Sequence, residues 1–292
     1  MDSAGVAVNP KTVQALEEYL NAPSQVLAII GPPASGKLEL AQRASAKLLD
    51  LDNQKLANYP YFFKITTQDG QRDISIDSVR LIIKELKSKV PGESPIRRIV
   101  LIESAYRLSQ EAQNALLKTL EQPNPETVFV LTLNSPAGIL PTVLSRAQKL
   151  TVYPISLMQA KKHYSSFSPA EVEQAWLISE GLAGELHSLL TGPDTSIKDS
   201  LALAKTFLSQ DSYHRLLSLD SLSKTRQSAN EFLTALAKLL KTLHHANIKK
   251  DNRKLSARIL TSRKLTAQTT EAINASAGTK LALLNLITNL PL

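Results

Sequence analysis

The stretch GPPASGKLEL, residues 31–40, follows the apolar run SQVLAII (24–30) and decides how the first half of the chain folds. Gly31, Gly36 and Lys37 match the phosphate-loop pattern G-x-x-x-x-G-K-[ST], but Leu38 stands where that pattern has Ser or Thr. In such loops the backbone N–H groups surround phosphates, the lysine neutralises their charge and the hydroxyl holds Mg²⁺. Because an expected strand precedes the loop and an expected helix follows it, we predict a phosphate cradle without its metal-binding hydroxyl. The alternative is a Gly-Pro turn before an ordinary helix.

Short apolar runs alternate with helical patterns up to about residue 155, which predicts a three-layer α/β unit. The expected strands cover residues 25–30, 61–66, 97–104, 127–134 and 149–155. Helices are expected to begin after the loop, near Ser75 or Asp77, and at a Ser109 cap.

Beyond about residue 157 the strand pattern ends and leucine- and alanine-rich amphipathic stretches dominate. The best internal linker is TGPDTS (191–196), because Gly, Pro, Asp and Ser favour loops. We therefore predict an α/β domain at 1–155, a small helical domain at 156–193 and a larger helical domain at 194–292.

The composition excludes several classes of protein. The 292-residue chain has no cysteine, which excludes disulfides, thiolate metal sites and cysteine nucleophiles. No apolar run approaches the length of a membrane span and no secretory signal is visible, so we expect no membrane partner. The absence of disulfides is consistent with a cytoplasmic protein.

The formal net charge is +8, and much of the excess lies between Lys241 and Lys264. Eight basic residues in this segment, 241–264, face only Asp251. A patch of this kind attracts phosphate backbones. The simpler alternative, a solvated helix face, is favoured by the absence of interleaved aromatic residues.

Phosphoryl transfer needs an acid at the end of a second strand to hold the metal, and usually a glutamate that activates water. The third expected strand ends in VLIESAYRLS (100–109), where Glu103 could take the metal-side position. The next residue, Ser104, offers no carboxylate for water. Charge alone does not separate this role from that of a polar residue at a strand end.

Three further stretches are more specific than the loop: ISIDSVRLIIKEL (74–86), LSQEAQNALLKTLEQP (108–123) and LTLNSPAGILPTVLSRAQ (131–148). With them, the first 190 residues resemble the clamp-loader subunits of bacterial DNA polymerase III, the delta-prime subunits and the related gamma/tau subunits. The last hundred residues match only in being helical. The resemblance implies an AAA+ fold: a RecA-like parallel-sheet domain, a small helical lid and an all-helical collar. It also implies a pentameric ring that places a sliding clamp around primed DNA.

The resemblance assigns roles to two further positions. Asn134 matches the sensor 1 position, where a polar side chain approaches the γ-phosphate. Ser145 and Arg146 match the SRC motif, whose arginine acts in trans as a finger on the ATP of a neighbouring subunit, although Ala147 replaces the cysteine. The forked guanidinium stabilises charge on a transferring phosphoryl group. As an isolated residue, Arg146 would be read as a surface charge.

Three departures from the family pattern predict that this chain does not hydrolyse ATP. Leu38 removes the metal-binding hydroxyl, and Ser104 removes the water-activating carboxylate. GLAGELHSLL (181–190) resembles the lid motif whose arginine touches the γ-phosphate, but Glu185 takes the place of that arginine and would repel an anion. The four-cysteine zinc module of delta-prime subunits is missing, and DLDNQKLANYP (50–60) occupies its place. We thus expect no zinc and no required cofactor, while binding of ATP or ADP remains open.

The expected function is that of a non-catalytic, stator-like clamp-loader subunit that donates Arg146 to a neighbouring ATPase. The alternatives are an active gamma-type ATPase and a subunit that binds nucleotide without hydrolysing it. The expected partners are the gamma/tau and delta subunits, the sliding clamp and primed DNA. Contact with DNA would run through the assembly or through the basic segment 241–264.

Overall fold

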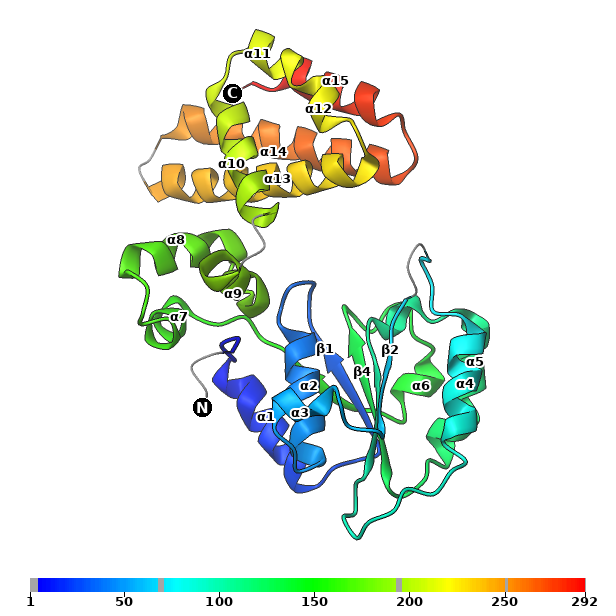
Figure 1. The fold of residues 1–292 in the computed structure, drawn as a ribbon. Helices are drawn as coiled ribbons and strands as arrows, with labels where there is room; N and C mark the ends of the chain where they lie inside the picture. Colours follow the sequence, from blue (N-terminus) through cyan, green and yellow to red (C-terminus); the bar gives the residue numbers. More distant parts are fainter. Residues whose placement is uncertain (1–4, 68–70, 193–195, 250–251, 292) are drawn as a thin grey trace. The chain divides into compact units, whose positions relative to one another are not determined.

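The computed structural model describes residues 5–67, 71–192, 196–249 and 252–291, and the chain forms two compact units (Figure 1). The first unit comprises Met1–Val172 and Ser179–His187, and the second comprises Glu173–Ile178 and Ser188–Leu292. Part of the expected linker, residues 193–195, lies outside the described residues. The expected boundaries after residues 155 and 193 stay predictions.

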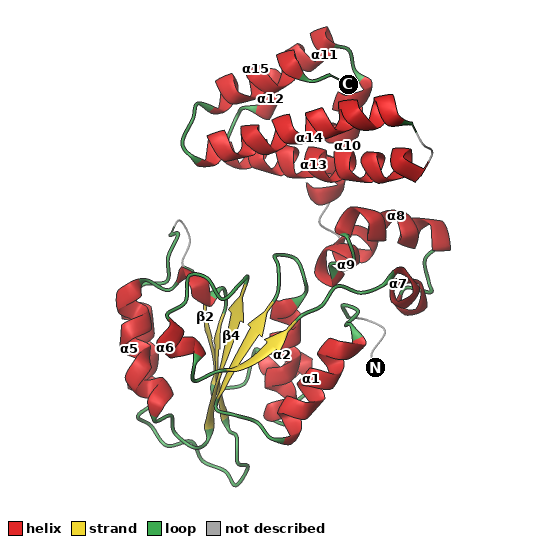
Figure 2. Cartoon of the chain, turned by 180° about the vertical axis from the view of Figure 1, so that it is seen from behind, coloured by secondary structure: helices red, strands yellow, loops and turns green. Residues whose placement is uncertain are grey.

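The first unit is built on a parallel five-stranded sheet, seen edge-on among its helices in Figure 2. The strands are β1 (Val26–Ile30), β2 (Phe62–Ile65), β3 (Arg98–Ile102), β4 (Thr127–Leu133) and β5 (Gln148–Thr151). Their order across the sheet is β2-β3-β4-β1-β5, so β1 lies between β4 and β5. All five expected strands are present, and the predicted α/β class is confirmed.

Helices cover both faces of this sheet, and β1 shows how the sequence accomplishes this. Its side chains alternate: Val26 and Ala28 pack into the core on one face of the sheet, while Leu27 and Ile29 pack into the core on the other. The covering helices are α1 (Pro10–Asn21), α2 (Lys37–Leu48), α4 (Ile76–Glu85), α5 (Gln110–Glu121) and α6 (Pro141–Leu144). A strand buried on both faces needs a continuous apolar run, which is why VLAII was recognisable as a strand.

Hydroxyl caps fix where two of these helices begin. The Ser75 Oγ accepts a hydrogen bond from the Ser78 amide at 3.3 Å, so Ser75 is the residue that begins α4. The Ser109 Oγ accepts from the Ala112 amide at 3.2 Å and caps α5, as predicted. The remaining elements up to residue 191 are α3 (Asn53–Leu56), the 3₁₀ turn η1 (Ala105–Arg107), α7 (Leu157–His163), α8 (Pro169–Ser179) and α9 (Ala183–Thr191).

The second unit is helical throughout its described residues. Its helices are α10 (Ser196–Ser209), α11 (Ser212–Leu217), α12 (Leu219–Leu222), α13 (Arg226–Lys249), α14 (Arg253–Asn274) and α15 (Thr279–Asn289). The two long helices α13 and α14 lie side by side in both ribbon views. Phe207, Phe232, Leu236 and Leu286 are fully buried in the core of this unit. No helix in the described part of the chain is long and apolar enough to cross a membrane.

Candidate functional site

Three neighbouring strands bring the sequence-predicted residues to one edge of the sheet. β3, β4 and β1 are adjacent and parallel, so their carboxyl ends lie together. The loop that begins at Gly31 follows β1, Glu103 follows β3 and Asn134 follows β4. Ligands of open α/β sheets bind at this edge. The expected site residues other than Arg146 therefore share one region.

The backbone of the loop keeps the shape that its glycines permit. Gly36 is the N-cap of α2 and has a φ of +84°, which favours glycine, and Ala34 has a φ of +60°. A Cβ at Gly31 would lie 2.8 Å from the Ser35 Oγ and 3.0 Å from the Val152 Cβ, so that position also favours glycine. The Gly31 amide donates to the Leu133 carbonyl at 3.0 Å, which ties the loop to the end of β4.

The Lys37 side chain turns back onto its own loop. Its ammonium donates to the Pro32 carbonyl at 3.0 Å. Burial lowers the pKa of Lys37, and the nearby Tyr106 phenol and Glu103 carboxylate act in the opposite direction. The lysine thus bonds to the loop backbone at the position from which it would reach a phosphate.

Glu103 and Ser104 have partners within the sheet edge. The Glu103 carboxylate forms an ion pair with the Lys64 ammonium at 2.8 Å. Ser104 has a left-handed backbone with a φ of +55°, and its amide donates to the Thr132 Oγ at 2.9 Å. Lys64 is therefore a cation beside the expected metal-side acid, and it disfavours a metal ion there by like charge.

Tyr106, on η1, is a site residue that the sequence motifs did not reveal. Burial raises the pKa of its phenol, but hydrogen bonds with Arg107, Ser104 and Asn134 outweigh that effect and lower it. The Tyr106 phenol also acts to raise the pKa of Lys37, so it lies close to that lysine. Its hydroxyl is therefore among the groups expected to face a γ-phosphate. A tyrosine after a strand end carries no phosphate-site signature, so no sequence pattern pointed to it.

The chain segment before α1 closes one side of the loop. The Val6 amide donates to the Glu39 carboxylate at 3.1 Å, and the Arg43 guanidinium pairs with the same oxygen at 2.6 Å. The Gly5 carbonyl lies 2.8 Å from the His163 Nε2. A Cβ at Gly36 would lie 2.9 Å from a Val6 methyl carbon, so Val6 packs directly against the loop.

Helix α9 closes another side. The Glu185 amide donates to the Ala34 carbonyl at 3.0 Å, which joins the start of α9 to the loop. A Cβ at Gly184 would lie 2.8 Å from the Ala34 carbonyl oxygen and 2.9 Å from the Gly36 nitrogen. Glu185, which the sequence places in the lid motif, is itself buried.

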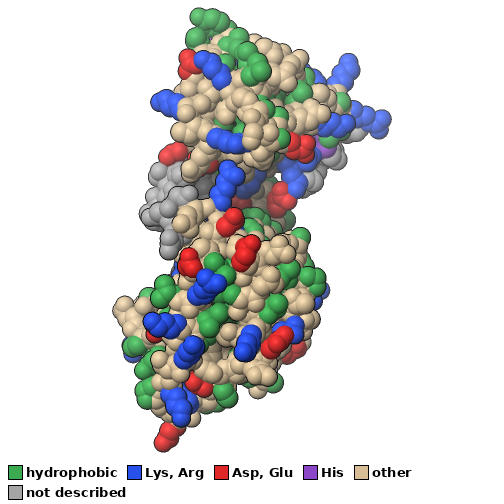
Figure 3. All heavy atoms as spheres, turned by 90° about the vertical axis from the view of Figure 1, so that its right-hand side faces the viewer, with side chains coloured by type: hydrophobic (Ala, Val, Ile, Leu, Met, Phe, Trp, Pro, Cys, Tyr) green, Lys and Arg blue, Asp and Glu red, His purple; other side chains and the backbone are tan. Residues whose placement is uncertain are grey.

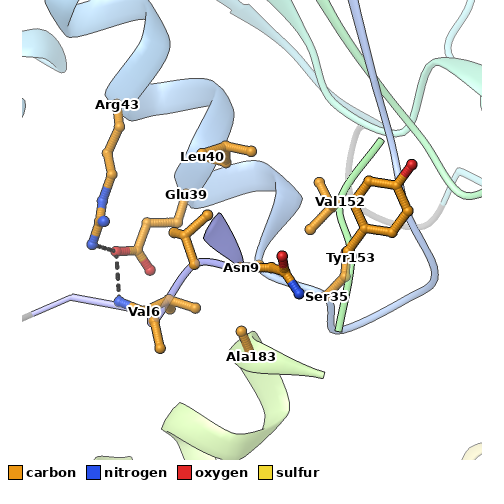
Figure 4. A pocket seen from close by; sticks show the side chains of 12 residues that line it. Val6, Asn9, Ser35, Glu39, Leu40, Arg43, Val152, Tyr153 and Ala183 are labelled. Carbon is orange, nitrogen blue, oxygen red and sulfur yellow. Dashed lines mark hydrogen bonds and ion pairs between the residues drawn. The ribbon is translucent and has the colours of Figure 1, made fainter. Parts of the chain in front are cut away.

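The pocket between these segments is nearly filled. Figure 4 shows Val6 and Asn9, Ser35, residues of α2, and Ala183 lining it from separate parts of the chain. The space open to the centre of a water molecule is about 10 Å³. That is room for about one water molecule, whereas small-molecule pockets typically have volumes of about 300–1,000 Å³. In this conformation this pocket, whose lining does not include Lys37, Glu103 or Asn134, is too small for a nucleotide.

Arg146 follows α6 and is not brought to the loop. Its guanidinium pairs with the Glu121 carboxylate of α5 at 2.6 Å and donates to the Thr142 carbonyl at 2.5 Å. The Arg146 side chain is 33% exposed. It is therefore an oriented surface cation, apart from the phosphate loop of its own chain.

No group of three or more His, Asp or Glu side chains among the described residues comes together as a potential metal site. The segment 50–60, which stands in place of the zinc module, contains the short helix α3.

The chain is similar to known replication proteins. The family model described as "DNA polymerase III, delta subunit" matches residues 9–156. The DNA polymerase III subunit delta' of Yersinia pestis is 28% identical over 207 residues, which cover 60% of this chain and 58% of that protein. For the Escherichia coli K12 subunit delta' the identity is 28% over 182 residues, covering 56% of this chain and 49% of that protein. The chain thus spans about half the length of these relatives.

Two further similarities extend beyond these proteins. The Replication factor C small subunit of Sulfolobus acidocaldarius is 29% identical over 164 residues, covering 53% of this chain and 48% of that protein. A DNA polymerase III gamma subunit-related protein of Thermotoga maritima has a structure that covers 95% of this chain and 97% of its own. The TM-score is 0.62 and the identity 18%, which establishes the likeness of fold alone. The expected fold class, a parallel-sheet α/β domain followed by helices, is confirmed.

Proposed function

The chain belongs to the family of DNA polymerase III delta-prime subunits, and on that premise we propose that it is a non-hydrolysing, stator-like clamp-loader subunit. In this role it donates Arg146 to the ATP site of a neighbouring motor subunit while a sliding clamp is placed on primed DNA. Its partners in the proposal are the gamma/tau and delta subunits in a pentameric ring, and the clamp.

The closed phosphate loop is the observation that carries the proposal. Val6 and Gly184 pack on the loop from two sides, and Lys37 bonds to Pro32. A nucleotide would have to displace both covering segments and break the bond from the Glu185 amide to the Ala34 carbonyl. Even then Leu38 provides no hydroxyl for Mg²⁺, and Ser104 provides no carboxylate for water.

The surroundings of Arg146 support a role in trans. A guanidinium has five N–H donors, and the bonds to Glu121 and Thr142 use only part of them. These two bonds hold the side chain in one orientation at the surface. An oriented guanidinium loses less conformational entropy when it meets a phosphate. It stabilises the charge of the transferring phosphoryl group through its forked donors.

The finger role is tested by clamp loading with purified motor subunits, clamp and primed DNA. We expect Arg146→Ala to lower the loading rate at least about tenfold, because removal of a finger costs several orders of magnitude at one site. Arg146→Lys keeps the charge but loses the fork, so we expect it to recover little activity.

The matched control is Arg226→Ala, which removes an exposed arginine from the second unit. Ring assembly, followed by size-exclusion chromatography, should be unchanged in all three variants. A normal loading rate with Arg146→Ala would reject the finger role.

Two other functions have distinct signatures. An active gamma-type ATPase would hydrolyse radiolabelled ATP in the presence of clamp and primed DNA, and Lys37→Ala would abolish that turnover. A subunit that binds without hydrolysis would give a calorimetric signal with ATP or ADP but no turnover. We expect neither signal from the isolated chain at millimolar nucleotide.

A further inference from the structure

Helix α5 holds the segment that carries Arg146 at two places. At the first, the buried Gln113 side chain donates to the Gly138 carbonyl at 3.1 Å and accepts from the Leu140 amide at 2.8 Å. These bonds fix the backbone just before α6. At the second, the Glu121 carboxylate accepts from the Arg146 guanidinium at 2.6 Å. One helix therefore fixes both the backbone that leads to Arg146 and the side chain of Arg146 itself.

The short helix α6 and the residues that follow it supply the other partners of the guanidinium. The Thr142 carbonyl accepts from the Arg146 Nη1 at 2.5 Å and from the Ser145 Oγ at 3.1 Å. The Ser145 Oγ lies 3.4 Å from the same Nη1. Nη1 is thus held near α6, while Nη2 is held by Glu121 of α5. Among the residues that the structure describes, no acceptor bonds the Nε–H, so that donor stays available to a phosphate oxygen.

Glu121 stands at an unfavourable position within its own helix. It is the last residue of α5, where the carbonyls at the helix end carry a partial negative charge that disfavours a carboxylate. The Glu121 side chain is also 48% exposed, and an ion pair so open to water contributes little to stability. The stability of the fold therefore does not account for a carboxylate at this position, whereas the orientation of Arg146 does.

The surrounding surface gives a single cation no orientation of its own. Figure 3 views the first unit from the side on which α4 and α5 lie in Figure 1. Acidic and basic side chains are interspersed on this side, and no broad patch of one sign is visible in the view. Fields of mixed charges at a surface are screened over short distances. The orientation of Arg146 therefore depends on its nearest partners.

Given the finger role proposed above, we propose that Glu121 is the positioning residue of the finger. Its carboxylate holds the Arg146 guanidinium in the orientation that meets the γ-phosphate of the ATP on the neighbouring subunit. Without this partner the arginine side chain samples several rotamers, and fixing one of them during the reaction costs conformational entropy. Because the neighbouring subunit binds the ATP, loss of Glu121 should lower the maximal rate and leave the ATP concentration for half-maximal rate unchanged.

The test is clamp loading by the full assembly, with purified motor subunits, clamp and primed DNA, over a range of ATP concentrations. We expect Glu121→Ala to lower the maximal loading rate about three- to tenfold, which is less than the loss in Arg146→Ala. Glu121→Gln keeps an oxygen acceptor at the same reach, so it should retain at least about half of the wild-type rate. Thermal unfolding of both variants should be unchanged, because the ion pair is exposed.

The matched control is Glu85→Ala, which removes the same charge from the exposed last residue of the neighbouring helix α4 and should leave the loading rate unchanged.

A double variant separates positioning from a structural role. If Glu121 acts only through Arg146, the variant with both Glu121→Ala and Arg146→Ala should load clamps at the rate of Arg146→Ala alone. A further loss in the double variant would overturn the proposal. A normal or raised rate with Glu121→Ala, measured beside a slow Arg146→Ala, would also overturn it. A normal rate with Arg146→Ala would instead reject the finger role itself, and the positioning role with it.

Discussion

Gly184 sets how closely α9 approaches the phosphate loop. The position of its missing side chain is occupied by two backbone atoms, the Ala34 carbonyl oxygen and the Gly36 nitrogen. Backbone atoms of a loop that follows a buried strand cannot turn aside as a flexible side chain can. The bond from the Glu185 amide to Ala34 therefore depends on a residue without a Cβ at the preceding position.

We expect Gly184→Ala to lower the free energy of unfolding by about 1–3 kcal/mol, because the added methyl group must push the loop and α9 apart. The measurement is urea unfolding followed by circular dichroism. The matched control is Gly278→Ala, where a Cβ would meet no atom within 4 Å. If the Gly184→Ala protein were as stable as the control, the contact between α9 and the loop could widen with no loss of stability.

His187 gives the first unit a predicted dependence on pH. Burial lowers the pKa of this imidazole; the Glu39 carboxylate raises it, and the His163 and Arg43 charges lower it. The Tyr164 hydroxyl lies 3.3 Å from the His187 Nδ1. Since the folded state binds the proton less tightly than the unfolded state, stability is full above the ordinary histidine pKa of about 6.5 and falls as the pH drops below it.

The test compares the wild type with His187→Gln, which keeps a polar side chain but cannot titrate. We expect the urea midpoint of the wild type to fall more between pH 7.5 and pH 5.5 than that of the variant. The difference between the urea midpoints of the two proteins at pH 7.5, where the imidazole is neutral, gives the structural cost of the substitution by itself. If the urea midpoints of the two proteins fell equally with pH, groups other than His187 would account for any loss of stability at low pH.

Residues of the phosphate-loop site could be predicted from the sequence only where they belong to a local motif or follow an apolar strand. Gly31, Gly36 and Lys37 belong to one loop, and Glu103 and Asn134 follow apolar strands, so their common edge could be predicted. Val6 and Gly184 reach the same loop from opposite ends of the first unit. Contacts between segments so distant in sequence leave no periodic pattern. Closure of the site could therefore not be predicted.

At the scale of elements, buried strands were easier to predict than the helical second half. β4 is buried along its whole length, and its apolar run was visible in the sequence. Strand β5 ends at Thr151, before the expected residue 155, because its partner β1 ends at Ile30 and Pro154 has no N–H to donate. Two of its four residues are lysine and glutamine, as expected for an edge strand.

Arg215 connects two helices in a way that the pattern of charges in the sequence does not predict. It belongs to the short helix α11 and is buried, with 3% of its surface exposed. Its Nε donates to the Phe207 carbonyl at 2.9 Å and its Nη2 to the Leu208 carbonyl at 3.0 Å. These are among the last carbonyls of α10, where the regular hydrogen bonds of the helix end. The Phe207 carbonyl also accepts from the Gln210 amide at 3.4 Å. An arginine in a polar stretch is read as a surface charge, but this one caps a neighbouring helix.

We expect Arg215→Ala to destabilise the second unit by about 2–4 kcal/mol, because it removes the side-chain donor of two carbonyls of α10 and opens a cavity beside Phe207. Thermal unfolding followed by circular dichroism measures the effect. Arg226→Ala, at an exposed position in the same unit, should change stability by no more than about 0.5 kcal/mol. A small effect of Arg215→Ala would show that water replaces the guanidinium.

On the scale of the whole molecule, the chain has separate hydrophobic cores for its two units. The two clusters that flank the sheet are formed by residues between Leu16 and Val152. The core of the helical unit is formed by residues between Ala204 and Leu290. A unit with its own core has the means to fold alone. The change in pattern near residue 157 does not coincide with this division, because α7, the start of α8 and residues 179–187 group with the first unit.

We therefore expect the fragments 1–192 and 196–292 each to unfold cooperatively when expressed separately. Each fragment keeps every buried residue of its own clusters, and both retain complete helices at the cut. Residues 173–178 and 188–192, which group with the second unit, stay in the first fragment. Circular dichroism during heating tests cooperativity, and amide chemical shifts compared with those of the full chain test whether each native structure persists. The first fragment should also keep the phosphate loop closed, because Val6, Gly184 and Glu185 all remain in it. If fragment 1–192 unfolded without a cooperative transition, closure of the loop would depend on the helical unit, and the cores would not be independent.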